Sequence, residues 1–113
     1  MEEKFEIKFL EEAWEFLHSI DAKASDKIIY NIRVVKKKND VALFKKLTDN
    51  IWEFRTFYNK THYRLFAFWD KGENTFVVAT HGLIKKTDKT PWGDLEKAER
   101  LRKDYFISKI TVS

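Results

Sequence analysis

Three consecutive strand-like runs between Ile51 and Thr87 constrain the fold of this chain more than any other feature. β-Branched and aromatic residues crowd these runs, and turn-forming residues separate them at Asn59-Lys60 and at positions 71–74. The pattern predicts three neighbouring strands of one sheet. The first two are expected to form a hairpin around Asn59-Lys60.

Side chains alternate between the two faces of a strand, and this alternation sorts the polar residues. In the first run Trp52 and Phe54 face one way, while Glu53 and Arg55 face the other. A hairpin would bring Arg64, at the start of the second run, onto a strand next to Arg55. The third run ends near His81 and leads into a basic pair. The rim of the sheet is therefore expected to gather six residues suited to a phosphate: Glu53, Arg55, Arg64, His81, Lys85 and Lys86.

Each of these residues also has a purely structural interpretation. Glu53 and Arg55 could form a cross-strand surface ion pair of little energetic value. His81 could be a buried histidine bonded to the backbone, because it ends an apolar strand. Arg64 is hardest to explain in this way, since an arginine on a hydrophobic central strand is costly without a partner or a role.

Length and composition bound the remaining possibilities. A chain of 113 residues with 43% hydrophobic and 16% aromatic residues is expected to form one globular domain over residues 1–113. It has no cysteine, which excludes disulfides and thiolate chemistry, and its three histidines lack metal-ligand spacing, so neither a metal nor a cofactor is expected. No signal pattern opens the chain, and the longest apolar run, Leu65 to Trp69, is too short for a membrane span. We expect a reducing, cytoplasmic setting without membrane contact.

The net charge of +4 conceals an asymmetry. Residues 1–20 hold six glutamates and two lysines, which leaves 20 basic and 12 acidic residues in the rest of the chain. A basic body suits a polyanionic ligand such as nucleic acid.

The segments before the three runs combine one strand with two helices. Residues 4–9 alternate as in a half-buried strand. A helix follows from Leu10, with one apolar face made of Leu10, Ala13, Trp14, Leu17 and Ile20. A second helix begins at Asp21 or Ser25 and ends in Lys36, Lys37 and Lys38. These lysines are interpreted either as a solvated helix end or as a second contact with RNA phosphates.

Two further segments remain ambiguous in the sequence. Residues 41–48 could form one helical turn before the first of the three strands. Thr90-Pro91 announces a last helix, with Thr90 as a possible N-cap and Leu95, Ala98, Leu101 and Tyr105 as its apolar stripe. Residues 107–113 could form a short edge strand or a frayed tail. The order of elements predicts an α+β domain whose helices are segregated from an antiparallel sheet.

With this order of elements, the chain resembles the HigB-like branch of the RelE superfamily of bacterial toxins, the phage-derived addiction-module toxins. The resemblance rests on WEFR at 52–55, HYRLFAFWD at 62–70, VVATHGLIKKT at 77–87 and EKAERLRKDYF at 96–106. It implies a small ribonuclease that cuts mRNA, usually on the ribosome. It also implies a helix-turn-helix antitoxin as partner, with operator DNA contacted only through that antitoxin.

The resemblance also bears on individual residues. Arg64, in its Tyr-Arg-Leu context, matches the phosphate-binding arginine, and Lys85-Lys86 matches the basic pair of this branch. Glu53 and Arg55 fall where many relatives place basic catalytic residues, so the general base could be Glu53 or a lysine. Relatives outside the branch carry a catalytic tyrosine or histidine near the C-terminus, whereas Tyr105 is expected in the core.

The chemistry of metal-free RNA cleavage requires groups of these kinds. One proton must leave the 2′-OH, charge on the phosphoryl oxygens must be stabilised, and the 5′ oxygen must be protonated. Arginines can hold the phosphate, and a lysine or His81 can transfer protons. Tyr58, Tyr63 and Trp92 could stack on unpaired bases, although Tyr63 could instead belong to the core.

The alternative function is a non-catalytic module of the same fold that binds RNA or an antitoxin. A third possibility is that toxin and antitoxin together bind operator DNA, with this chain supplying only protein contacts.

Overall fold

The computed structural model describes residues 4–72, 74–87 and 91–111. Its elements, in chain order, are β1 (Glu6–Phe9), α1 (Glu11–Ser19), α2 (Ala22–Lys37), β2 (Phe44–Lys46), β3 (Trp52–Tyr58), β4 (Thr61–Asp70), β5 (Phe76–Lys85) and α3 (Trp92–Thr111). This confirms the α+β class, the N-terminal strand and helix pair, the three central strands and the C-terminal helix. No helix in the described ranges combines the length and apolar character needed to span a bilayer.

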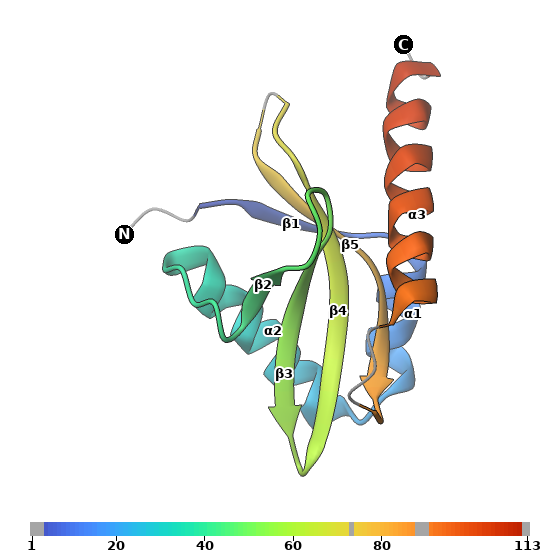
Figure 1. The fold of residues 1–113 in the computed structure, drawn as a ribbon. Coiled ribbons are helices and arrows are strands. Elements are labelled where there is room, and N and C mark those ends of the chain that lie inside the picture. Colours follow the sequence, from blue (N-terminus) through green and yellow to red (C-terminus); the bar gives the residue numbers. More distant parts are fainter. Residues whose placement is uncertain (1–3, 73, 88–90, 112–113) are drawn as a thin grey trace.

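The five strands form one mixed sheet in the order β1-β5-β4-β3-β2 (Figure 1). The pairings β2–β3, β3–β4 and β4–β5 are antiparallel, but β1 runs parallel to β5. The predicted antiparallel core of the sheet is therefore confirmed, and β1 adds a parallel strand at its edge, which the sequence did not predict. Alternation along residues 4–9 specifies which side chains face the core, and it carries no information about strand direction.

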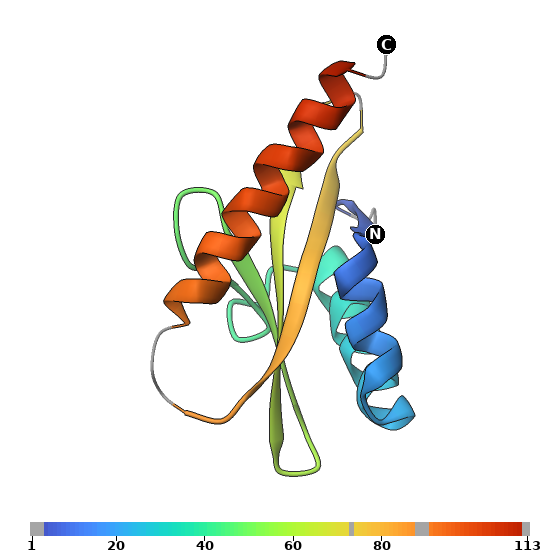
Figure 2. The same cartoon turned by 90° about the vertical axis from the view of Figure 1, so that its right-hand side faces the viewer.

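Helices cover both faces of the sheet (Figure 2). On one face, α1 and α2 enclose a core that includes Ile28 and Ile32 of α2 together with Phe54 and Leu65 of the sheet. On the other face, α3 covers a smaller core around Phe66, Phe68 and Val78. The two cores use alternate residues of β4, as its sequence pattern predicts. Each central strand is thus buried on both faces along much of its length.

The two N-terminal helices largely follow their predicted patterns. Asp21 is the N-cap of α2, where its side chain accepts a hydrogen bond from the Lys23 backbone N–H at 3.1 Å. Ser25 lies inside the helix and donates to the Leu17 carbonyl. The assignment of Trp14 to the buried face of α1 is wrong, because its side chain is 55% exposed. Its ring packs beside His18 at the border of the apolar stripe, with centroids 4.5 Å apart.

A close contact between Phe16 and Gly82 sets the position of α1 on the sheet. The ring of Phe16 lies directly over Gly82 of β5, where an added Cβ would stand only 2.2 Å from a ring carbon. Real Cβ atoms do not come this close, so only glycine leaves room for the ring. Gly82 therefore fixes the distance between helix and sheet just before the basic end of β5.

Two ambiguous segments take definite forms. Residues 41–43 form the expected single turn, in which the Asp40 carbonyl accepts hydrogen bonds from the backbone N–H groups of Leu43 and Phe44. The short strand β2, which the sequence did not predict, follows this turn and pairs with β3. Residues 107–111 continue α3, which rules out an edge strand or a tail over that range. The Lys109 ammonium donates to the Asp70 carboxylate of β4 at 2.7 Å, which fixes this last part of the helix to the sheet. Thr90 falls outside the described residues.

Candidate functional site

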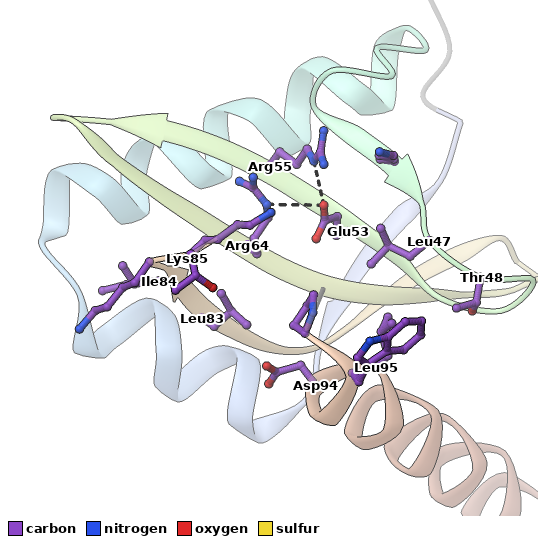
Figure 3. Close-up of a pocket in the computed structure, with 15 residues that line it drawn as sticks. Leu47, Thr48, Glu53, Arg55, Arg64, Leu83, Ile84, Lys85, Asp94 and Leu95 are labelled. Carbon is purple, nitrogen blue, oxygen red and sulfur yellow. Dashed lines mark hydrogen bonds and ion pairs between the residues drawn. The ribbon is translucent and has the colours of Figure 1, made fainter. Parts of the chain in front are cut away.

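A cleft of about 500 Å³ opens where the sheet meets the start of α3 (Figure 3). The sheet contributes Glu53 and Arg55 from β3 and Arg64 from β4. The opposite wall comes from the segment that begins α3 and includes Trp92 and Asp94. Residues distant in sequence therefore meet at one hollow that combines several charged groups.

Glu53 lies at the centre of the charged floor. Its Oε1 atom accepts a hydrogen bond from Arg55 Nε at 2.8 Å and lies 3.5 Å from Arg64 Nε (Figure 3). Arg55 and Arg64 are direct partners across the β3–β4 pair, which confirms the predicted juxtaposition. Glu53 and Arg55 do form an ion pair. The expectation of a cross-strand pair at the surface is wrong, because Glu53 is only 4% exposed and Arg55 follows it on the same strand. One buried carboxylate thus holds two guanidinium groups together.

The Arg64 side chain is held in a costly environment. Burial lowers the pKa of Arg64, the Glu53 carboxylate opposes that shift, and the adjacent Arg55 adds to it. Among the buried side-chain polar atoms of the described residues, Arg64 Nε alone lacks a hydrogen-bond partner. The 3.5 Å separation from Glu53 supports an ion pair but lies at the outer limit for a hydrogen bond. A bound anion would supply the interactions that this guanidinium lacks.

Three lysines add to the positive charge of the cleft. Lys45 of β2 is the register partner of Glu53, Lys85 is the last residue of β5, and Lys86 directly follows it. The described lining therefore holds five lysines or arginines against the two carboxylates of Glu53 and Asp94. This excess favours an anionic ligand, and the guanidinium pair favours one with several oxygens, such as a phosphodiester.

A β-bulge in β5 determines which side chains face the cleft. Phe66 of β4 pairs with His81, but the next residue, Ala67, pairs with Ala79, so Thr80 is an extra residue on β5. Beyond the bulge the alternation is shifted by one residue. As a result Leu83, the partner of Arg64, and Lys85 face the cleft instead of the α1 side.

His81 lies beneath this surface, outside the described lining of the cleft. Its Nε2 is 3.0 Å from Asp94 Oδ1, its Nδ1 is 3.0 Å from Thr80 Oγ1, and its ring stacks on Phe66 with centroids 5.0 Å apart. His81 is therefore buried, as its structural interpretation held, but its ring nitrogens bond to two side chains and not to the backbone. Burial lowers the pKa of His81, while the hydrogen bond to Asp94 partly opposes that shift. The geometry gives His81 a direct role in holding the start of α3 against β5.

The predicted base-stacking and second RNA-contact residues are dispersed by the fold. Trp92 lines the cleft and is 69% exposed. Tyr63 belongs to the core under α1 and α2, and Tyr58 packs against the same core, so both lie on the opposite face of the sheet. Lys36 and Lys37 end α2, which also covers that face, and Lys38 is its C-cap; none of these lysines lines the cleft.

Sequence reasoning missed three residues of this region. Asp94 and Lys45 line the cleft, and exposed Phe57 extends the face of β3 that carries Glu53 and Arg55. Phe57 could have been found from the sequence, because side chains two residues apart on a strand share a face and Phe57 follows Arg55 by two residues. The positions of Lys45 and Asp94 depend on a three-residue strand and on the docking of α3, for which the sequence holds no comparable signal. In the part of the chain that the structure describes, no group of three or more histidine, aspartate or glutamate side chains is arranged to hold a metal ion.

The chain matches the model of a known protein family. The model of the phage-derived, Gp49-like protein family (DUF891) matches residues 15–103, which include every residue of the cleft named above. No curated protein matches the chain significantly.

Proposed function

The chain belongs to the Gp49-like family of phage-derived proteins (DUF891). From this membership and from the chemistry of the cleft, we propose that it is an endoribonuclease toxin. We assign it to the HigB-like branch of the RelE superfamily, in which a toxin is encoded with its antitoxin. Its substrate is mRNA, bound on the ribosome, and its cleavage inhibits translation. The reaction uses the ribose 2′-OH and needs no metal ion.

The observation that carries this proposal is the buried carboxylate flanked by two guanidinium groups. Arg55 and Arg64 are held as direct cross-strand partners by Glu53 Oε1, in a cleft with an excess of cations. A phosphodiester needs paired donors for its two non-bridging oxygens, and the attacking hydroxyl needs a nearby base. The cluster of Glu53, Arg55 and Arg64 offers both the paired donors and the base.

The steps of the reaction follow from these roles. Glu53 takes the proton of the 2′-OH, and the 2′ oxygen attacks the adjacent phosphorus while Arg64 and Arg55 stabilise the phosphoryl oxygens. The bond from phosphorus to the 5′ oxygen breaks, and Lys85 or Lys86 donates a proton to that oxygen. The products are a 2′,3′-cyclic phosphate and a 5′-hydroxyl end. A lysine of the cleft is the alternative base.

The proposed biological setting follows from the family branch. The partner is an antitoxin with a helix-turn-helix DNA-binding domain, and operator DNA is contacted through that antitoxin. Both proteins act in the cytoplasm, where translating ribosomes present the mRNA.

A second candidate function is RNA or antitoxin binding without cleavage. It is favoured by the position of His81, whose imidazole is buried against Asp94 and outside the described lining of the cleft. Without a histidine at that surface, proton transfer depends on Glu53 and the lysines alone.

A cleavage assay on translating ribosomes separates the two candidates. The purified wild-type chain is added to ribosomes translating a defined mRNA, and new 5′ ends are located by primer extension. We expect cleavage by the wild type and a loss of about 10²- to 10³-fold in Arg64→Ala, the scale for removing one donor to a developing charge. Arg33→Ala is the matched control, because Arg33 is an exposed arginine of α2 on the opposite face.

Chemical substitution of the mRNA tests the nucleophile. A single 2′-deoxynucleotide on the 5′ side of the mapped cut is expected to abolish cleavage there. Cleavage that persists in this mRNA would contradict the 2′-OH mechanism. A wild-type chain that binds RNA without cutting it would favour the second candidate.

A further inference from the structure

The tip of the β3–β4 hairpin carries an exposed aromatic pair that the cleft does not include. Phe57 and His62 are register partners, and their ring centroids are 4.6 Å apart with an interplanar angle of 39°. Phe57 is 57% exposed, and His62 is exposed as well. The two rings therefore pack on each other at the surface, outside both cores.

The turn geometry holds this pair in place. Asn59 and Lys60 both have positive φ angles, 49° and 61°, as the tight two-residue hairpin turns that match the strand twist require. The turn pairs Tyr58 with Thr61 and, one step further, Phe57 with His62. The pair is therefore fixed relative to the sheet by backbone hydrogen bonding.

The pair lies on the same face of the sheet as the charged cleft. Phe57 follows Arg55 by two residues on β3, and His62 precedes Arg64 by two residues on β4, so each ring shares a face with an arginine. Two residues of a strand span about 7 Å, which is comparable with the length of one extended nucleotide. The rings thus lie about one nucleotide from the guanidinium pair.

A second hollow lies between His62 of this pair and the cleft. It has a volume of about 250 Å³ and is lined by His62, Arg64, Lys85, Lys86 and Thr87. Arg64, Lys85, Lys86 and Thr87 also line the cleft, so the two hollows adjoin each other. Its described lining contains three cations and no carboxylate.

We propose that Phe57 and His62 form a base-stacking subsite for single-stranded RNA, which takes the base of a nucleotide adjacent to the phosphate held by Arg64. Stacking on exposed rings beside a cationic groove is the usual way in which proteins hold unpaired nucleotides. An apolar protein segment would be a poor occupant, because cations flank the rings: Lys85 is the register partner of His62, and Arg55 and Arg64 lie two residues away on the same face. This inference rests on the proposed function for the identity of the ligand.

The subsite is tested by RNA binding, independently of cleavage. The probe is a fluorescent single-stranded RNA of about ten nucleotides with 2′-O-methyl riboses, which lack the nucleophilic hydroxyl, and binding is read by fluorescence anisotropy. We expect Phe57→Ala to weaken binding about five- to twentyfold and Phe57→Trp to retain or improve it. His62→Ala is expected to weaken binding to a smaller extent. Circular dichroism is used to confirm that each variant is folded.

Tyr30 supplies a matched control. It is a 57% exposed aromatic residue of α2, on the opposite face of the sheet, so Tyr30→Ala should bind the RNA like the wild type. Equal binding by wild type and folded Phe57→Ala would overturn the subsite, as would an equal loss in Tyr30→Ala. A wild-type chain that does not bind this RNA would also overturn it.

The same variants separate this inference from the ribonuclease proposal. If the wild type cuts mRNA but Phe57→Ala binds RNA normally, the subsite is wrong while the ribonuclease stands. If no variant cuts RNA but Phe57→Ala alone weakens binding, the subsite stands and the catalytic proposal fails.

Discussion

Arg55 and Arg64 face each other directly across the β3–β4 pair, and the buried carboxylate of Glu53 binds both of them. Like charges at such positions repel, and the Glu53 carboxylate between them offsets this repulsion. The cluster is therefore both a structural element of the sheet and the proposed phosphate site.

The first prediction concerns the stability of this cluster. Glu53→Gln removes the charge that compensates two arginines, so we expect the free energy of unfolding to fall by about 2 kcal/mol. Adding Arg55→Gln to this variant should restore part of the lost stability, because it removes the repulsion between Arg55 and Arg64. Urea denaturation measures both effects, and Glu15→Gln, an exposed glutamate of α1, is the control. A Glu53→Gln chain as stable as the wild type would contradict this account.

The second prediction concerns the packing of α1. Gly82→Ala forces the Phe16 ring to move, and we expect it to lower the free energy of unfolding by about 1–3 kcal/mol. The double variant with Phe16→Leu should recover stability if the ring is the obstacle. Gly93→Ala in α3 is a matched control, since nothing lies within 4 Å of its added Cβ and alanine is the better helix former. Equal effects of the two glycine substitutions would contradict the close approach.

The third prediction concerns pH. Burial lowers the pKa of native His81 below its ordinary value of 6.5, although Asp94 and Glu12 oppose the shift and Lys97 adds to it. Between these two pKa values the unfolded chain binds more protons than the native chain, so stability is complete above about pH 6.5 and falls as the solution is acidified. The carboxylates of Asp70 and Glu12 also have lowered pKa values, and their contributions disappear at lower pH, below their ordinary values of 3.8 and 4.5.

Urea denaturation between about pH 7 and pH 5 measures this dependence. The wild type should lose stability over that range, whereas His81→Gln should have a flatter profile. A wild-type profile that rises on acidification would contradict the direction of the shift.

The fourth prediction separates Tyr105 from catalysis. Burial and the hydrogen bond to Asp70 raise the pKa of Tyr105 to about 12, so its hydroxyl stays protonated. This hydroxyl donates a hydrogen bond to Asp70 Oδ2 at 2.7 Å. We expect Tyr105→Phe to lower the free energy of unfolding by about 1–2 kcal/mol. Cleavage by the folded variant should be unchanged, because Tyr105 does not line the cleft. A selective loss of cleavage would instead assign Tyr105 to the reaction.

Much of the fold followed from alternation along strands and periodicity along helices. The face shared by Glu53 and Arg55, and the neighbouring position of Arg64, required only a period of two and a turn at Asn59-Lys60. These features are local, and a single sequence carries enough information to predict them.

Two of the features that sequence reasoning missed depend on contacts distant in the chain. The parallel pairing of β1 with β5 leaves no trace in the alternation of β1. The bulge at Thr80 shifts the faces of β5, so His81, Leu83 and Lys85 face away from the side that simple alternation from Val77 assigns to them. The choice of stacking residues failed for a local reason. Tyr58 and Tyr63 have aromatic rings that could stack on bases, but they lie on the face of the sheet opposite Arg55. Phe57 is two residues from Arg55 on the same strand and therefore shares its face.

The most direct test of the central claim is the mapping of 5′-hydroxyl mRNA ends in bacteria that express this chain from a controlled promoter. Wild type, Arg64→Ala and Arg33→Ala are compared while growth is followed. The account predicts new 5′-hydroxyl ends and growth arrest with the wild type and Arg33→Ala, and neither with folded Arg64→Ala. The same new ends and the same arrest with Arg64→Ala would contradict it.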